Sequence, residues 1–194
     1  KMKGLKMRMP GLGGEVLRQI GASAVTLPGG EIFPALQAGT IDATEWVGPY
    51  NDMAFGFQQI LKNYMYPGFH EPGSGLAVGI NKAWWDSQTD ADKALITACC
   101  DAENDRMMAE YNARNGDSLG KLLTDFGVKL HKFPDEVFKE IADASEQVVA
   151  DVAQGDDIGK RIYESYAAFR KNVSGWTNLS DAAYMGARNA ALGL

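Results

Sequence analysis

The chain has 194 residues, of which 45% are hydrophobic and 23% charged, and its formal net charge is −6 at pH 7. These proportions are typical of a globular protein and exclude an intrinsically disordered chain. The negative charge argues against a nucleic-acid partner, because such a partner requires a basic face. No apolar run in the sequence approaches the ~20 residues that a membrane-spanning helix needs.

The first fifty residues alternate between short strands and short helices. We expect strands at 5–9, 24–27 and 40–47 and helices at 15–20 and 31–38, with glycine or proline at the ends of the segments. A β-α-β-α-β order with short connections predicts a parallel, doubly wound sheet. The predicted fold class is therefore α/β.

Aromatic residues and loops dominate the next segment. A helix is expected to about Gly56 and a further turn to about Asn63, followed by a loop over 67–73 that proline and glycine bracket. Residues 76–80 are almost wholly apolar, which is typical of a buried central strand. A brief helix is expected over 81–87.

A long helix is predicted from Asp90 to Phe126, which corresponds to roughly 55 Å at 1.5 Å per residue. Thr89 and Asp92 have the spacing of a capping box, and Gly127 is the first good C-cap. Small side chains recur along one face, which predicts a closely packed neighbour. They are Ala91, Leu95, Ala98, Ala102, Ala109 and Ala113. We interpret a helix of this length as a strut that spans two lobes.

The last third of the chain is mostly helical. A short strand is expected at 128–131, followed by helices over 134–154 and from 158 to near Gly175. Ser180 is a candidate cap for a final helix over 181–190.

Arg8 stands at the end of the first expected strand, just before Pro10-Gly11. Its planar guanidinium can bind a carboxylate through two parallel hydrogen bonds, and the backbone N–H groups of the helix start near Gly13 add to such a site. This combination suits a receiver for a carboxylate or a phosphate. The alternative is an exposed strand arginine without a ligand.

Glu45 and Trp46 end the third expected strand, and Gly48-Pro49 then begins a helix. A carboxylate and an aromatic ring at the carboxyl end of a strand often form a small-molecule site in α/β proteins. Glu45 suits a cation or a substrate hydroxyl, and Trp46 suits an apolar wall, although strand alternation sends only one of them to a given face. The alternative is a surface glutamate and a core tryptophan.

Glu71 lies beside His70 in the bracketed loop. Together with Glu45 it favours either a cation with oxygen ligands or a catalytic acid and base, as in a lyase or hydrolase. The sequence contains no zinc-ligand spacing, P-loop or nucleophile elbow. Of the nearby aromatic residues, most are expected in the core and one or two in a pocket, with Tyr50 and Phe69 as candidates.

Three stretches of sequence resemble one family. They are MRMPGLGGEVL, VTLPGGEIFPALQAGTIDATEWVGPYNDMAFGF and YPGFHEPGSG. They are similar to the solute-binding subunits of TRAP transporters, the DctP family, and most of all to the branch that binds 2-oxo acids and related monocarboxylates. The resemblance covers nearly the whole chain and includes the long helix.

The resemblance implies a periplasmic two-lobed receptor, not an enzyme, that captures an anionic solute and delivers it to a sodium-driven membrane permease. Arg8 matches the arginine that pairs with the ligand carboxylate, and Glu45 and Trp46 match the floor of the cleft. In the 2-oxo-acid branch a cation, commonly sodium, joins ligand and protein. Glu45, the backbone of Trp46, and Glu71 correspond to its partners, and no catalytic cofactor is implied.

Such receptors are about half again as long, so the resemblance also implies that the N-terminal lobe and the signal peptide lie outside this chain. We expect residues 1–70 to form the α/β core of the second lobe with the ligand residues. Residues 71–126 would form a crossover strand and the connecting helix, and 127–194 a strand and the C-terminal helices. Exposed apolar surface on such a half-receptor favours a homodimer.

Overall fold

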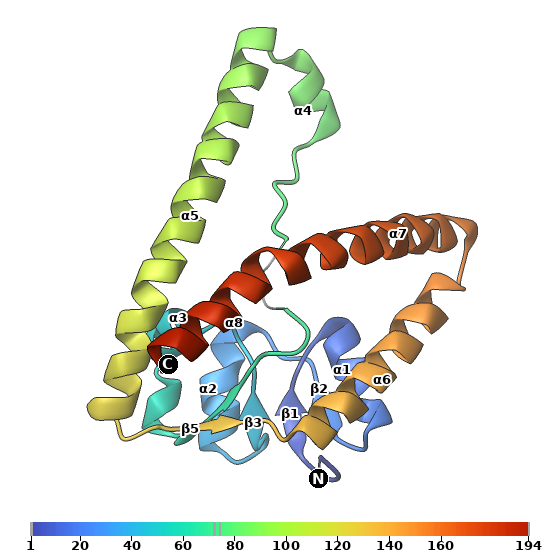
Figure 1. Cartoon of the computed structure of the whole chain (residues 1–194). Helices are drawn as coiled ribbons and strands as arrows, with labels where there is room; N and C mark the ends of the chain where they lie inside the picture. Colours follow the sequence, from blue (N-terminus) through green and yellow to red (C-terminus); the bar gives the residue numbers. More distant parts are fainter. Residues whose placement is uncertain (1, 72, 74, 194) are drawn as a thin grey trace. The chain divides into compact units, whose positions relative to one another are not determined.

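A computed structural model describes residues 2–71, 73 and 75–193 of the chain (Figure 1). The chain divides into two compact units, residues 1–142 and 143–194. The elements up to the boundary are β1 (Lys6–Arg8), α1 (Gly11–Gln19), β2 (Ser23–Val25), α2 (Gly29–Gln37), β3 (Ala43–Thr44), α3 (Pro49–Ala54), a 3-10 turn η1 (Phe57–Gln59), β4 (Asn63–Tyr66), α4 (Lys82–Ser87), α5 (Asp90–Thr124), β5 (Lys129–Lys132) and α6 (Asp135–Ala153), which crosses it. The second unit continues with α7 (Asp157–Leu179) and α8 (Asp181–Leu192).

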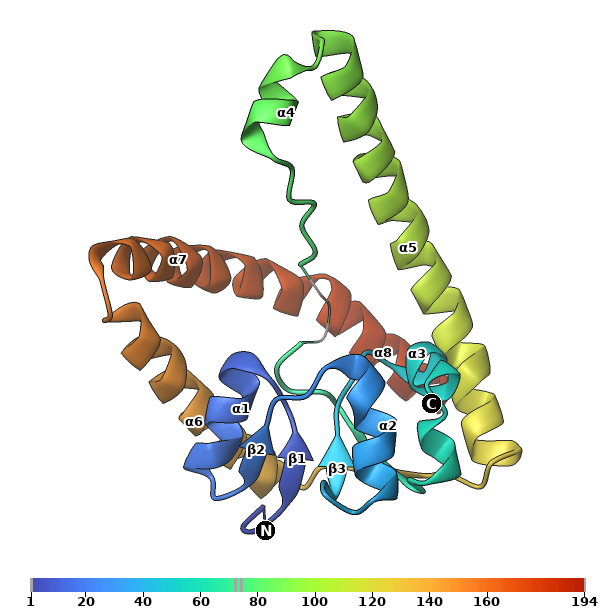
Figure 2. The same cartoon turned by 180° about the vertical axis from the view of Figure 1, so that it is seen from behind.

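The β-α-β-α-β order predicted for the first fifty residues is confirmed. β1 is the central strand of a three-stranded sheet in the order β2-β1-β3, and both of its neighbours run parallel to it. Figure 2 shows the three strands side by side, with α1 next to β2 and α2 next to β3. The α/β fold class is therefore correct, although each strand is shorter than expected.

Two apolar clusters hold the sheet to its helices. The first joins the end of β1, α1 and β2, and the second joins α2, η1 and the residues just before β3. Their buried members are Met9, Leu17, Ala22 and Ala24 in the first and Ile32, Leu36, Ile41 and Phe57 in the second. Phe69 packs against the first cluster and Trp46 against the second, so two of the three predicted site aromatics also cover the core.

The pairing of β4 with β5 was not predicted. These strands form a separate parallel pair in which Tyr64 lies opposite Leu130 and Met65 opposite His131. The strand predicted at 128–131 corresponds to β5, but β4 was not predicted, because it is short and its partner lies far away in the sequence. β4 matters for the site because it presents Tyr64.

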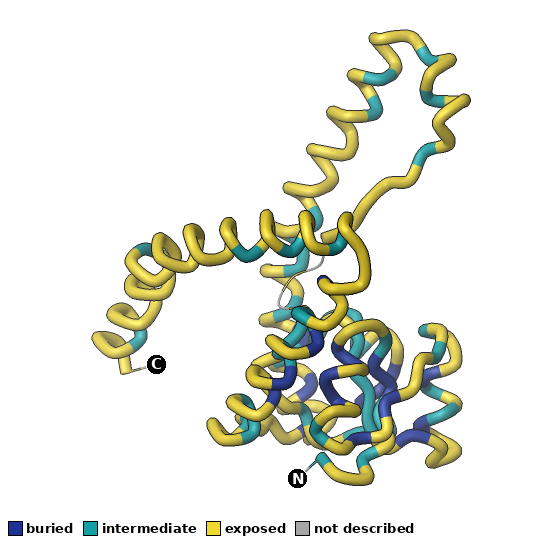
Figure 3. The backbone as a smooth tube through the Cα atoms, turned by 90° about the vertical axis from the view of Figure 1, so that its right-hand side faces the viewer, coloured by how far each residue is buried: buried dark blue, intermediate teal, exposed yellow. Residues whose placement is uncertain are grey.

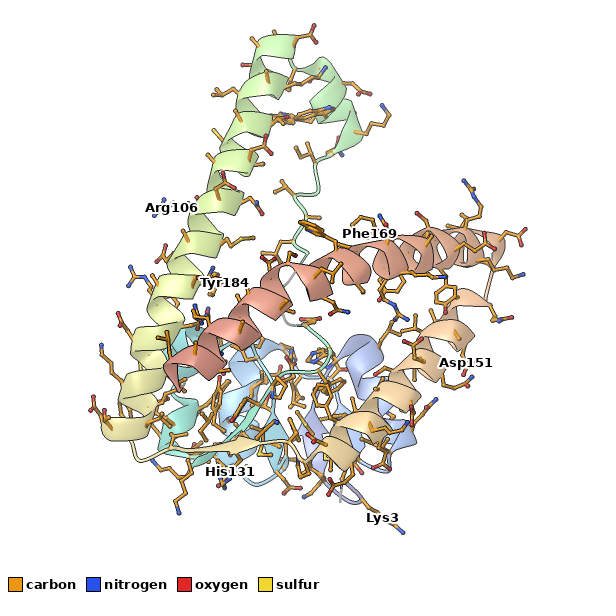
Figure 4. The ribbon with its side chains drawn as sticks, viewed as in Figure 1. Lys3, Arg106, His131, Asp151, Phe169 and Tyr184 are labelled. Carbon is orange, nitrogen blue, oxygen red and sulfur yellow. The ribbon has the colours of Figure 1, made fainter. Side chains whose placement is uncertain are left out.

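α5 is close to its predicted length and begins as expected, since the Thr89 side chain accepts a hydrogen bond from Asp92 N at 3.2 Å. Its predicted small-residue contact face is wrong: Leu95 is 64% exposed, and only Ser118 and Leu122 of this helix are buried. Figure 3 shows that dark-blue buried residues gather in the lower part of the view while the far part of α5 is mostly yellow with a few teal residues. Arg106 projects from this exposed part, as labelled in Figure 4.

The apolar run at 76–80 is not a strand in the structure. Leu76 is 91% exposed and Val78 is 70% exposed, and no described segment pairs with them. An apolar sequence favours a strand only where a neighbouring strand supplies hydrogen bonds and an apolar face covers its side chains. Neither is provided by the part of the chain that the structure describes.

In the second unit, α7 continues through Gly175 to Leu179, so the predicted end is too early. Ser180 makes no side-chain cap for α8, because its hydroxyl donates to Trp176 O at 2.9 Å instead. α7 carries an exposed apolar stripe at helical spacing. Its members are Ile158, Ile162, Tyr166, Phe169, Val173 and Trp176. Phe169 is labelled in Figure 4.

Candidate functional site

The carboxyl ends of the three parallel strands meet at one edge of the sheet. Arg8 ends β1, Leu27 follows β2, and Glu45 follows β3. Because neighbouring parallel strands present their carboxyl ends at the same edge, residues far apart in sequence converge there. This edge is where the sequence analysis placed Arg8 and Glu45.

Arg8 is buried, with 8% of its surface exposed, and some of its guanidinium N–H donors already have partners. Nε donates to the carbonyl oxygen of Leu27 at 3.1 Å, and Nη1 forms a short ion pair with Oε1 of Glu45. The guanidinium also lies 5.3 Å from the centre of the Trp46 ring. The interpretation of Arg8 as an exposed strand residue is therefore wrong.

Trp46 is fixed by the ring of Phe55, 4.9 Å away, and by the start of α2. A Cβ at Gly29 would lie 2.7 Å from the Trp46 ring, so only glycine allows the ring to lie this close to the backbone. The indole N–H is buried and has no hydrogen-bond partner among the described residues. The ring therefore forms a wall beside Arg8.

His70 joins this group, a role that the sequence analysis did not assign to it. Its Nε2 lies 3.7 Å from Oε2 of Glu45, and its ring lies 5.0 Å from that of Phe69. Burial is the main reason why the pKa of His70 is lowered, and Arg8 lowers it further, while Glu71 acts in the opposite direction. His70 is therefore neutral at pH 7 and its contact with Glu45 is not an ion pair.

Glu45 is a half-buried carboxylate in a mixed electrostatic environment. Its pKa is raised chiefly by burial, while Arg8 lowers it and the charges of Glu71 and Asp52 raise it again. The arginine keeps the carboxylate paired, because a buried charge without a partner is costly. We refer to Arg8, Glu45, Trp46 and His70 as the Arg8 cluster.

The remaining predicted site residues lie around this cluster at different positions. Glu71 is exposed, and it acts on Glu45 and His70 through its charge. Phe69 connects to the cluster through the His70 ring. Tyr50 instead faces α5, with its ring 6.3 Å from that of Tyr111 and 5.2 Å from the Arg114 guanidinium.

The described residues contain no group of three or more His, Cys, Asp or Glu side chains that could hold a metal ion. The donors of the predicted cation site are nonetheless of the right kind. Carboxylates of Glu45 and Glu71 and a backbone carbonyl of Trp46 are hard oxygen ligands, as sodium and calcium prefer. Such a set is incomplete without further oxygen atoms from a ligand or from residues outside this chain.

A separate surface cavity of about 310 Å³ lies between Pro67 and the β5–α6 connection. Its lining includes Phe133, Phe138 and Lys132, and Lys132 lies 3.9 Å from Asp135. None of its lining residues belongs to the Arg8 cluster. The predicted site residues lie at the sheet edge and not in this cavity, so we assign the site to the sheet edge.

Comparison with known proteins identifies the family of the chain. Residues 1–156 match the family model DctP, described as bacterial extracellular solute-binding protein, family 7. The chain belongs to this family. Its members are solute-binding receptors, so the prediction that the chain is not an enzyme is confirmed, and the lyase or hydrolase alternative is not supported.

Relatives of this DctP chain include a monocarboxylate 2-oxoacid-binding periplasmic protein of Nostoc sp., 40% identical over 184 residues. The match covers 94% of this chain and 50% of the relative, so the chain spans about half the length of that protein.

No helix among the described residues is long and apolar enough to cross a membrane.

Solved structures similar to this chain include TRAP solute-binding proteins of three bacteria. A TRAP transporter solute-binding protein of Bordetella bronchiseptica, a dimer with calcium and picolinate, has a TM-score of 0.90 and 34% identity, covering 99% of this chain and 57% of its own. The proteins of Pseudoalteromonas atlantica, with sodium and pyruvate, and Colwellia psychrerythraea, with calcium and pyruvate, both have TM-scores of 0.89 and 35% identity. In each case the match covers 95% of this chain and 56% of the other.

Proposed function

We propose that this chain is the ligand-carrying half of a periplasmic TRAP receptor that binds a small carboxylate, most simply a 2-oxo acid of the size of pyruvate. The observation that carries the proposal is the buried Arg8 at the sheet edge, between Glu45 and the Trp46 ring. The similar proteins named for 2-oxo acids or solved with pyruvate support the choice of ligand class.

The chemistry of Arg8 explains how a carboxylate would be recognised. A guanidinium has five N–H donors, and in the described part of the chain Nη2 has no bonded acceptor. A ligand carboxylate can accept hydrogen bonds from Nη2, and the opposite charges of the two groups strengthen each bond. The buried position raises the strength of such contacts, since less water competes for the guanidinium.

A cation would supply the positive charge that the ligand and Glu45 together require. We propose that Glu45, Glu71 and the backbone carbonyl of Trp46 contribute oxygen ligands to it, with sodium as the expected ion. Arg8 cannot fully neutralise Glu45 and a ligand carboxylate at once, so a second positive charge near Glu45 favours the complex. The presence of sodium or calcium together with pyruvate in two similar proteins supports this set.

The test is titration calorimetry of pyruvate into the full-length receptor, with sodium present and with sodium replaced by choline. We expect binding that weakens without sodium. Arg8→Ala should weaken it about a hundredfold or more, because two charge-assisted hydrogen bonds are lost. The affinity of Arg8→Lys for pyruvate should lie between those of the unchanged receptor and Arg8→Ala, because lysine keeps the charge but cannot form two parallel hydrogen bonds.

Arg18→Ala is the matched control, because Arg18 also pairs with a glutamate, Glu15, but lies exposed on α1. It should bind pyruvate as the unchanged receptor does. No heat with pyruvate or any other small carboxylate would refute the proposed function, and unchanged affinity in Arg8→Ala would refute the role of Arg8.

We also propose two partners. The receptor delivers its ligand to the membrane permease subunits of a TRAP transporter, and it is a homodimer. The dimer of the Bordetella protein and the exposed stripe on α7 support the second proposal. Sedimentation of the full-length receptor tests it: Phe169→Asp should shift a dimer to monomer, and a monomeric unchanged receptor would refute it.

A further inference from the structure

The four residues 45–48 connect β3 to α3 and include Trp46, whose ring forms the wall beside Arg8. Their backbone is held by a side chain from the helix that follows. Oδ1 of Asp52 accepts hydrogen bonds from Val47 N at 3.2 Å and from Gly48 N at 3.3 Å. These two N–H groups directly follow Trp46. The Asp52 carboxylate therefore fixes the backbone conformation immediately after the Arg8 cluster.

Asp52 is itself held from a third element. Its Oδ2 accepts from the hydroxyl of Tyr64, on β4, at 2.5 Å. Burial raises the pKa of Asp52, and the hydrogen bonds from Tyr64, Val47 and Gly48 oppose that shift. Three donors on one half-buried carboxylate are more than a simple helix cap requires. They tie the connection to β4 as well as to α3.

The long helix α5 also contacts this connection and the start of α3. Oδ1 of Asn115, on α5, accepts from Tyr50 N at 3.0 Å. A Cβ at Gly48 would lie 3.2 Å from the same oxygen, so the absence of a side chain at Gly48 lets Asn115 approach. The Tyr50 ring also lies against Tyr111 and Arg114 of α5.

We propose that Asp52 and Asn115 are positioning residues for ligand binding. They fix the Trp46 wall and the Glu45 backbone relative to β4 and to α5, so that Arg8 and Trp46 keep the geometry that receives a carboxylate. Neither residue needs to touch the ligand for this role. The inference rests on the proposed function.

The ordinary alternative is that both residues only stabilise the start of α3. Ligand affinity separates the two cases, because a residue that only stabilises α3 changes stability and not affinity. The conservative variant Asp52→Asn keeps an Oδ1 that accepts from Val47 N and Gly48 N while the charge is removed. Asp52→Ala removes all three acceptor contacts. Thr89→Ala is the matched control: it removes a helix cap of the same kind from α5, far along the helix from Asn115.

The experiment is calorimetry of pyruvate binding to the full-length receptor in sodium buffer, with unfolding by urea measured for each variant. Asp52→Ala should weaken binding about tenfold, and Asn115→Ala several-fold, since each loses hydrogen bonds that hold the wall. Asp52→Asn should remain within about threefold of the unchanged receptor. Thr89→Ala should lose stability without losing affinity.

A second measurement does not depend on pyruvate. In a receptor in which Trp84, Trp85, Trp176 and any tryptophan outside this chain are replaced by phenylalanine, the fluorescence of Trp46 reports its own surroundings. Acrylamide should quench Trp46 more strongly in Asp52→Ala and Asn115→Ala than in Asp52→Asn or Thr89→Ala. Tyr64→Phe, which removes only the hydroxyl contact to Asp52, provides a milder variant if Asp52→Ala fails to fold.

Each result decides one question. If the unchanged receptor does not bind pyruvate, the proposed function fails, and the quenching still tests the positioning of Trp46. If the receptor binds but the alanine variants bind as tightly as Thr89→Ala, the positioning role is refuted. Equal quenching of Trp46 in all variants would refute it as well. Loss of affinity in Asp52→Asn as large as in Asp52→Ala would show that the charge, and not the geometry, matters.

Discussion

Two short segments that the sequence predicts as strands, residues 5–9 and 76–80, have different environments in this molecule. The first forms β1 between two parallel neighbours, and its last residue, Met9, is 2% exposed. The second has no partner strand among the described residues, and Leu76 is 91% exposed. The difference shows that a sequence with a strand pattern becomes a strand only where neighbours complete its hydrogen bonds.

The largest effect expected from this comparison concerns core packing. Leu17, on α1, is fully buried against β1, so Leu17→Ala should cost about 2–5 kcal/mol of stability through the cavity that it leaves. Leu76→Ala, which removes the same atoms from an exposed position, should change stability by less than about 0.5 kcal/mol. Urea unfolding of this chain measures both. A loss for Leu76→Ala comparable to that for Leu17→Ala would show that residues 76–80 are covered after all.

The next effect concerns the ion pair at the end of β1. Arg8→Ala should destabilise the chain by about 2–4 kcal/mol, because it leaves Glu45 half-buried without its partner. Arg8→Ala combined with Glu45→Ala should recover part of that loss, since the unpaired charge is removed. Urea unfolding of the single and double variants tests this, and a double variant less stable than Arg8→Ala would contradict it.

A pH effect follows from Asp52. Burial raises its pKa in the folded state, so its contribution to stability is fully present below the unfolded pKa and is lost as the pH rises through the folded pKa. Asp52→Asn does not titrate, so its stability relative to the unchanged chain should increase as the pH rises from acid to neutral. Urea unfolding across that pH range measures the trend. A falling relative stability of Asp52→Asn over this range would contradict the sign.

The smallest effect belongs to the exposed ion pairs. Lys82 and Asp86 pair at 2.6 Å on α4, but 86% of the lysine side chain and 55% of the aspartate side chain are exposed. Water screens this pair, so Lys82→Ala should change stability by less than about 1 kcal/mol. Thermal unfolding beside Arg8→Ala measures the contrast, and equal losses in the two variants would show that burial does not decide the strength of these pairs.

Part of the site was predictable from local signals. Arg8 was found because it ends a strand before a proline, and Glu45 and Trp46 because they follow a strand and precede Gly48-Pro49. The assignment of ligand and cation contacts to these residues stays a prediction, as do the domain boundaries proposed from the sequence. Asp52 and Asn115 were missed, since an aspartate early in a helix and an asparagine within a long one are common and carry no motif.

The sequence by itself determined the local order of this protein. Glycine and proline end the short elements, apolar periodicity marks the strands and helices around Arg8, and Thr89 with Asp92 starts α5. These features depend on neighbours within a few residues, so they can be read along the chain.

Only the tertiary structure decided which of these elements meet. Arg8 pairs with Glu45 across 37 residues, and Asn115 bonds the backbone of Tyr50 across 65. The same holds for β4, which pairs with a strand more than sixty residues away, and for residues 76–80, which find no described partner. Contacts between distant segments depend on the packing of whole elements, and no local pattern of residues encodes them.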